Sequence, residues 1–135
     1  MNPQVNEIIS DLKSHNWYKQ NPAIEKLDSP FLESIEDDML FLLGRNIYQS
    51  AVGNSTAAIN FLNDFSTKTV KLSAQKRKAL LDGILFEIFF DKNGEIRENF
   101  KLSQFNNVFG LVSFEEYRES FNFIYDAILN YANRF

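Results

Sequence analysis

Glu87 is the acidic side chain whose sequence surroundings most suggest a chemical role. It follows Leu80 by seven residues and Ile84 by three, so in a helix its carboxylate leaves from the edge of an apolar face. A buried carboxylate must be paired, hydrogen-bonded or protonated. The expected partner is Arg45, on a second strongly apolar helix, and the neighbouring Asn46 also needs hydrogen bonds. We predict a buried polar group of these three residues. It either fixes how two helices register, which is the favoured interpretation, or lines a functional pocket.

A run of cations forms the second candidate site. Between residues 65 and 81 the chain has no acid and carries Lys68, Lys71, Lys76, Arg77 and Lys78. Three of them fall in the first turns of a helix that Ser73 can cap, where unpaired N–H groups can receive an anion. The predicted anion site is Lys71, Ser73, Lys76, Arg77 and Lys78. The favoured interpretation is nevertheless a solvated loop and first turn, since surface cations are tolerated there.

The residue types that most catalytic and metal sites require are scarce. The chain has no Cys, which excludes disulfides, zinc-thiolate sites, iron–sulfur ligation and thiol nucleophiles. Its single His, His15, cannot supply a site of several histidines, and we expect a structural role for it. No glycine-rich phosphate loop, His-Glu-x-x-His motif or nucleophile elbow is present. We therefore predict no catalytic residue, no metal site and no cofactor.

The elements that would position these residues are helices, because apolar residues recur with helical periodicity. The spacing predicts a helix at 5–12, a polar connector at 15–22 with Trp17 and Tyr18 tucked against the body, and a long helix from Ser29 or Ser34 to about Val52. Further helices are expected at 56–65, 74–92, 102–109 and 113–131. The long helix and the one at 74–92 are apolar around most of their circumference, which is typical of central helices. Asn93-Gly94 also permits a small hairpin over 88–97.

Length and charge indicate the class of protein. The 135 residues, 44% of them hydrophobic, fit one domain over 1–135. We predict an all-α bundle of five or six helices with at most that one minor hairpin. The net charge of −4 weakly repels polyanions. Because neither a signal sequence nor a membrane-spanning apolar stretch is visible, we expect a soluble cytoplasmic protein with no membrane contact.

Most of the 14 Phe residues fall on inward helical faces. Phe123, on the polar side of the last predicted helix, and Phe135, the final residue, do not. Exposed aromatic side chains beside polar residues suggest a contact surface. We therefore predict that Phe123 and Phe135 contact a protein partner or a second copy of the chain.

These observations favour a non-enzymatic binding or regulatory protein that acts through protein–protein contact, with a protein partner or as a homodimer. The alternative is an anion- or nucleic-acid-binding domain that uses segment 68–78, of the kind found in bacterial defence or toxin–antitoxin systems. Nucleic acid is the less favoured partner because of the negative charge. One ribonuclease family of such systems carries Arg-x-x-x-x-His on a helix, but here the stretch from Arg45 ends in Ser50.

Overall fold

The computed structural model describes residues 3–90. Within this range the chain forms seven helices and no strand, which confirms the all-α prediction. They are α1 (Pro3–Lys13), α2 (Trp17–Glu25), α3 (Ser29–Glu33), α4 (Asp37–Val52), α5 (Thr56–Asn63), α6 (Phe65–Thr69) and α7 (Ala74–Phe89). The helices predicted at 102–109 and 113–131 lie outside the described residues.

Short polar side chains begin three of these helices. Asp28 accepts a hydrogen bond from the N–H of Phe31 at the start of α3, over 2.9 Å. Ser55 accepts from the N–H of Ala58 at the start of α5, and Ser73 caps α7 in the same way. Each cap satisfies a backbone donor that the first helical turn leaves without a partner.

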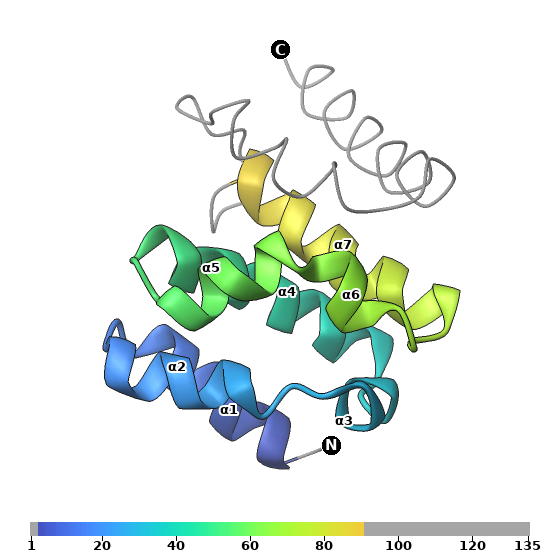
Figure 1. The fold of residues 1–135 in the computed structure, drawn as a ribbon, viewed down its shortest axis with the longest axis horizontal. Helices are drawn as coiled ribbons and strands as arrows, with labels where there is room; N and C mark the ends of the chain where they lie inside the picture. The colour runs from blue at the N-terminus through green and yellow to red at the C-terminus, as the bar shows by residue number, and fades with distance from the viewer. Residues whose placement is uncertain (1–2, 91–135) are drawn as a thin grey trace.

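The two central helices are α4 and α7, as the sequence predicts, and Figure 1 shows them side by side. They meet at Gly44 and Gly83. A Cβ atom on Gly44 would overlap the carbonyl oxygen of Leu80, and one on Gly83 would overlap the carbonyl oxygen of Phe41. The two backbones are thus in contact, which only glycine permits.

Fully buried aliphatic side chains surround this crossing. Those on α4 and α7 are Leu40, Leu43, Ile47, Leu80, Leu81, Ile84 and Leu85. They belong to the apolar faces that the helical phasing assigns to the centre. The ends of both helices are thereby held at fixed positions relative to one another, which matters for the polar residues described below.

The helices α1, α2 and α5 pack against α4 (Figure 1). The side chain of Gln20 on α2 donates to the carbonyl oxygen of Leu12 on α1 over 2.9 Å. Asn21 Oδ1 accepts from Ser55 Oγ at 2.7 Å and from the N–H of Ala57 at 3.2 Å. These bonds tie the start of α2 to the end of α1 and to the start of α5.

The connector predicted over 15–22 is wrong, because most of it belongs to α2. Pro22 lies inside this helix and has no backbone N–H to donate, which disfavours a helix in the sequence. Gln20 is a polar residue on the buried side of α2, so the apolar residues here do not follow a helical period. The expected packing of Trp17 and Tyr18 is also wrong. Their exposed fractions are 65% and 58%.

Of the two predicted starts of the long helix, the earlier one, at Ser29, begins a separate short helix, α3. The long helix α4 begins near the later start, at Asp37, and ends at Val52 as predicted. Asp28, not Ser29, is the N-cap of α3, and Pro30 stands in its first turn. Between the two helices the carbonyl oxygen of Ile35 accepts a hydrogen bond from Lys76 Nζ over 2.6 Å. In a continuous helix the carbonyl oxygen of Ile35 would instead accept a hydrogen bond from the backbone N–H four residues later.

The hairpin predicted over 88–97 does not begin at 88, since Ile88 and Phe89 are the last residues of α7. Phe90 is extended, with φ −122° and ψ 146°. Residues 91–97 lie outside the described part of the chain.

Candidate functional site

Glu87 is fully buried near the C-terminal end of α7, where side chains from α4 meet it. Arg45 Nε donates to its Oε2 atom at 2.8 Å. Gln49, one turn further along α4, donates through Nε2 to its Oε1 atom. Each carboxylate oxygen therefore accepts a hydrogen bond from α4, and the guanidinium charge compensates the buried negative charge.

An aromatic ring completes the surroundings of Arg45. Its guanidinium carbon lies 4.9 Å from the centroid of the Phe86 ring, within the range of a cation–π contact. Phe86 in turn meets Phe41 edge to face, with ring centroids 5.4 Å apart. Both sides of the arginine are thus fixed, by a carboxylate and by a ring. This geometry is suited to holding α4 and α7 in one register, and no solvent-exposed carboxylate oxygen is available on Glu87 for a substrate.

Of the three residues predicted to form this polar group, the structure brings Arg45 and Glu87 together. Asn46 is buried but hydrogen-bonds locally, since its Nδ2 atom donates to the carbonyl oxygen of Leu42 at 2.8 Å. Gln49 is the member that sequence reasoning missed. Its position four residues after Arg45, on the same helical face, is the signal that indicates it.

The predicted anion site surrounds the start of α7, where an acidic side chain already lies. Glu33 Oε2 accepts a hydrogen bond from the backbone N–H of Ser73 over 3.0 Å. The hydroxyl of Ser73 accepts from the N–H of Lys76. An external anion would therefore compete with the Glu33 carboxylate at this helix end.

The cations of the predicted anion site contact protein acceptors. Lys76 pairs with Asp37 at 3.0 Å, Arg77 Nε donates to the Thr69 carbonyl oxygen at 3.1 Å, and Lys78 pairs with Asp82 at 2.6 Å. The remaining cation, Lys71, is exposed beside a groove of about 480 Å³. The other lining residues of this groove are Asp28, Ser29, Pro30 and Glu33, so it presents both signs of charge.

Asp37 lies at the start of α4 between two residues of α7. Its Oδ2 atom accepts from Gln75 Nε2 at 2.6 Å, and its Oδ1 atom is the partner of Lys76. The hydrogen bond from Gln75 and the bond and charge of Lys76 lower the pKa of this carboxyl, and the small desolvation only partly opposes them. This pair closes the end of the central helices opposite to Glu87.

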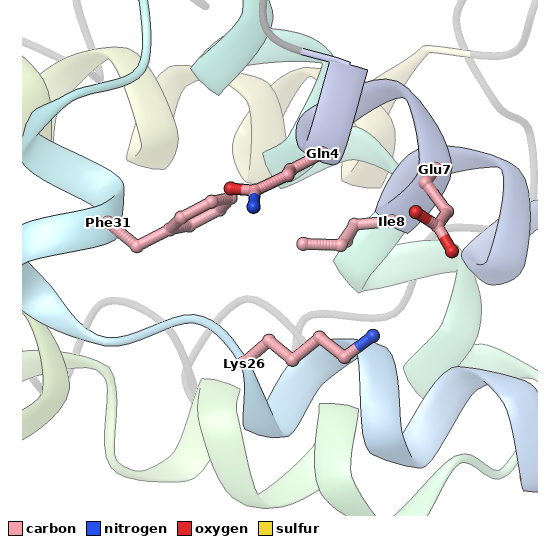
Figure 2. Close-up of a pocket in the computed structure, with 5 residues that line it drawn as sticks. All are labelled: Gln4, Glu7, Ile8, Lys26 and Phe31. Carbon is pink, nitrogen blue, oxygen red and sulfur yellow. The ribbon is translucent and has the colours of Figure 1, made fainter.

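A small pocket of about 310 Å³ lies between α1 and the segment that joins α2 to α3 (Figure 2). Gln4, Glu7 and Ile8 come from α1, Lys26 follows α2, and Phe31 comes from α3. Ile8 and Phe31 supply apolar surface, whereas Glu7 and Lys26 place opposite charges at the rim. Sequence reasoning missed this pocket, because its residues come from three segments without a shared motif.

Among the side chains that the structure describes, the most exposed aromatic ones are Trp17 and Tyr18, at the start of α2. Their ring centroids are 5.9 Å apart and their planes make an angle of 86°. They contact each other edge to face, an arrangement in which two large rings hold one another on the surface. His15, just before them, is exposed in a left-handed backbone conformation with φ 61°. The predicted contact residues Phe123 and Phe135 lie outside the described residues.

Residues 3–90 contain no group of three or more His, Asp or Glu side chains that could hold a metal ion. None of the helices described here is long and apolar enough to cross a membrane. Comparisons with protein-family models, with curated proteins and with solved structures find no match to this chain.

Proposed function

We propose that this protein is a non-enzymatic helical binding protein that acts by contact with another protein. The observation that carries the proposal is the exposed pair of Trp17 and Tyr18 at the start of α2. Tryptophan and tyrosine are enriched among the residues that dominate binding energy at protein interfaces. Exposing two such rings side by side has no benefit for the packing of the free protein.

The polar residues near the centre support this proposal. Glu87, Arg45 and Asp37 bind partners within the chain and join α4 to α7, so they act in stability. The alternative, an anion- or nucleic-acid-binding domain at segment 68–78, has less support. Three of its cations contact protein acceptors, and Glu33 lies at the helix end that would receive an anion. That binding takes place in the cytoplasm remains a prediction from the sequence.

Affinity capture with a matched set of variants tests the proposal. Tagged wild-type protein, the double variant Trp17→Ala/Tyr18→Ala and the control Val70→Ala are used as baits in the native cell. Val70 is a third exposed apolar residue, 62% accessible, and it follows α6. We expect one or more proteins to be recovered with the wild type and with the control, and to be lost with the double variant.

Circular dichroism and light scattering on the purified proteins accompany the capture. Because the substituted side chains are exposed, all three proteins should have the same helical content. An identical set of captured proteins for all three baits, or none from any of them, would overturn the proposal. A homodimer would be seen by light scattering, and it supports the proposal only if the double variant is monomeric.

A further inference from the structure

We infer that the corner between α1 and α2 binds an acidic segment of a protein partner. This α1–α2 corner consists of residues 13–19, with Trp17 and Tyr18 as its aromatic contact and Lys13, His15 and Lys19 as its polar surroundings. The inference rests on the proposed function and adds the chemistry of the partner. It is carried by charge and by the distribution of exposed apolar surface.

The α1–α2 corner is positive in a protein whose net charge is −4. Lys13, His15 and Lys19 are all exposed, and residues 12–24 contain no Asp or Glu. The flanking acids are Asp11, half-buried on α1, and Glu25, two turns further along α2. An approaching acidic segment therefore meets two full positive charges beside the aromatic pair.

Apart from Asp11 of α1, the helices that pack against α2 bring no acid to this end. These neighbours are α1, α4 and α5. Residues 39–63, which include almost all of α4 and the whole of α5, contain no Asp or Glu. Their single charged residue is Arg45, which is paired with Glu87 at the α4–α7 contact. The surface formed by the start of α2, the end of α4 and the start of α5 is therefore free of acids.

Four of the exposed large apolar side chains lie in these segments, whereas Leu42 and Val70 lie elsewhere. Besides Trp17 and Tyr18, Val52 at the end of α4 is 57% accessible and Ile59 on α5 is 37% accessible. The bonds of Asn21 to Ser55 and Ala57 hold these segments together, and Figure 1 shows the α1–α2 and α4–α5 turns at the same end of the molecule. A partner with both acidic and apolar side chains matches this surface.

The geometry favours a protein segment over single-stranded nucleic acid. Bases bind to aromatic side chains by stacking on their faces, along a groove that follows many phosphates. Here the two rings are nearly perpendicular, so they do not form a continuous stacking platform. Two lysines also neutralise few phosphates, which predicts weak binding in a chain of negative net charge.

The fluorescence of Trp17 measures the charge at the α1–α2 corner directly, because it is the single tryptophan of the chain. Iodide and caesium ions are used as quenchers of opposite charge. We expect iodide to quench the wild type more strongly than caesium does, and this preference to reverse in Lys13→Glu/Lys19→Glu. The control Lys68→Glu/Lys71→Glu has the same change in net charge at two other exposed lysines, and it should retain the wild-type preference. Stronger quenching of the wild type by caesium would overturn the inference.

Binding is then measured with defined probes by the same fluorescence signal. The probes are a synthetic peptide of Glu-Leu-Glu-Ala repeats, its Lys-Leu-Lys-Ala counterpart and oligo-dT. We expect the acidic peptide to bind best, in a salt-sensitive manner, and about tenfold more weakly to Lys13→Glu/Lys19→Glu than to the wild type or to the control. Tighter binding of oligo-dT would assign the corner to nucleic acid and overturn the inference. Equal losses in the two double variants would also overturn it, since only the total charge would matter.

Failure of this inference and failure of the proposed function give different results. If capture depends on Trp17 and Tyr18 but the acidic peptide does not bind, the corner binds a partner of another chemistry. If capture does not depend on Trp17 and Tyr18, the proposed function fails whatever the peptides do.

Discussion

Arg45 and Glu87 form an ion pair that joins the two central helices, although 42 residues separate them in the chain. The nitrogen and oxygen are 2.8 Å apart, Glu87 is fully buried, and the Arg45 side chain remains 21% exposed. Arg45 and Gln49 can both reach the Glu87 carboxylate only at one rotation of α7 about its axis and one position of α7 along α4. The ion pair therefore selects a single register of α7 against α4. Aliphatic packing alone would discriminate less strongly between neighbouring registers.

Replacing Arg45 with Met should destabilise the protein strongly. The Arg45→Met variant keeps most of the side-chain volume but leaves a fully buried carboxylate without its cation. Removing one partner of a buried pair costs about 3–5 kcal/mol. Urea unfolding followed by circular dichroism at neutral pH measures the loss.

The double variant Arg45→Met/Glu87→Leu serves as the control for this prediction. Because it removes the buried charge together with its partner, it should be more stable than Arg45→Met alone. The single variant Glu87→Leu completes the comparison. If the stability losses in Arg45→Met and Glu87→Leu add up to the loss in the double variant, the two side chains are not coupled, and the ion pair does not join the helices as the geometry indicates.

A methyl group at the helix crossing should also be poorly tolerated. In Gly83→Ala the new Cβ would overlap the backbone carbonyl of Phe41, which cannot rotate away as a side chain can. Overpacking of this kind costs about 1–3 kcal/mol or more, because the two helices must separate. Thermal unfolding should show a clear fall in the midpoint temperature.

Gly53→Ala is the matched control for the crossing. Gly53 ends α4 with φ −80°, and the nearest atom to a built Cβ is 3.5 Å away, an ordinary contact. This substitution should leave stability unchanged or raise it by about 0.4–1 kcal/mol, since it restricts the unfolded chain. Equal losses of stability in Gly53→Ala and Gly83→Ala would show that the backbones of α4 and α7 are not in direct contact at Gly83.

Asn21→Ala should loosen α2 from α5. The substitution removes an acceptor from the hydroxyl of Ser55 and from the N–H of Ala57, a first-turn donor of α5. Loss of such bonds costs about 1–3 kcal/mol. Hydrogen exchange should show faster exchange at Ala57 than in the wild type. The exposed Asn60→Ala on α5 should change stability by less than about 0.5 kcal/mol, and a similar loss there would assign the effect to α5 itself.

The centre of the fold could be predicted from the sequence because its apolar residues follow one period. Helical phasing on 40–51 and 80–88 selects the same faces that are buried in α4 and α7. Phasing also places Glu87 at the edge of its apolar face, so its carboxylate needs a partner, and Arg45 is the cation on the other central helix. A residue pair of this kind follows from burial and charge alone.

The remainder depends on contacts that no local pattern contains. At the break between α3 and α4 the carbonyl oxygen of Ile35 accepts a hydrogen bond from Lys76, 41 residues away in the chain. The helix α2 has a buried Gln20 and an internal Pro22, both of which contradict the usual helical pattern. Exposure of Trp17 was likewise mispredicted, because composition cannot separate an aromatic residue that packs from one that faces solvent.

The contribution of Asp37 to stability should disappear in acid. Its pKa is lowered from the ordinary value of 3.8 by the hydrogen bonds from Gln75 and Lys76. A group whose pKa is lower in the folded state stabilises the protein above its unfolded pKa, and the benefit is lost as the pH falls through the folded pKa. Because the Asp37 side chain is 41% exposed, solvent screening limits the benefit to less than about 1 kcal/mol. Urea unfolding should therefore show Asp37→Asn to be slightly less stable than the wild type at neutral pH, with the two curves converging below the lowered pKa. A difference that persists unchanged in strong acid would mean that the shape of the side chain matters at this position, and not its charge.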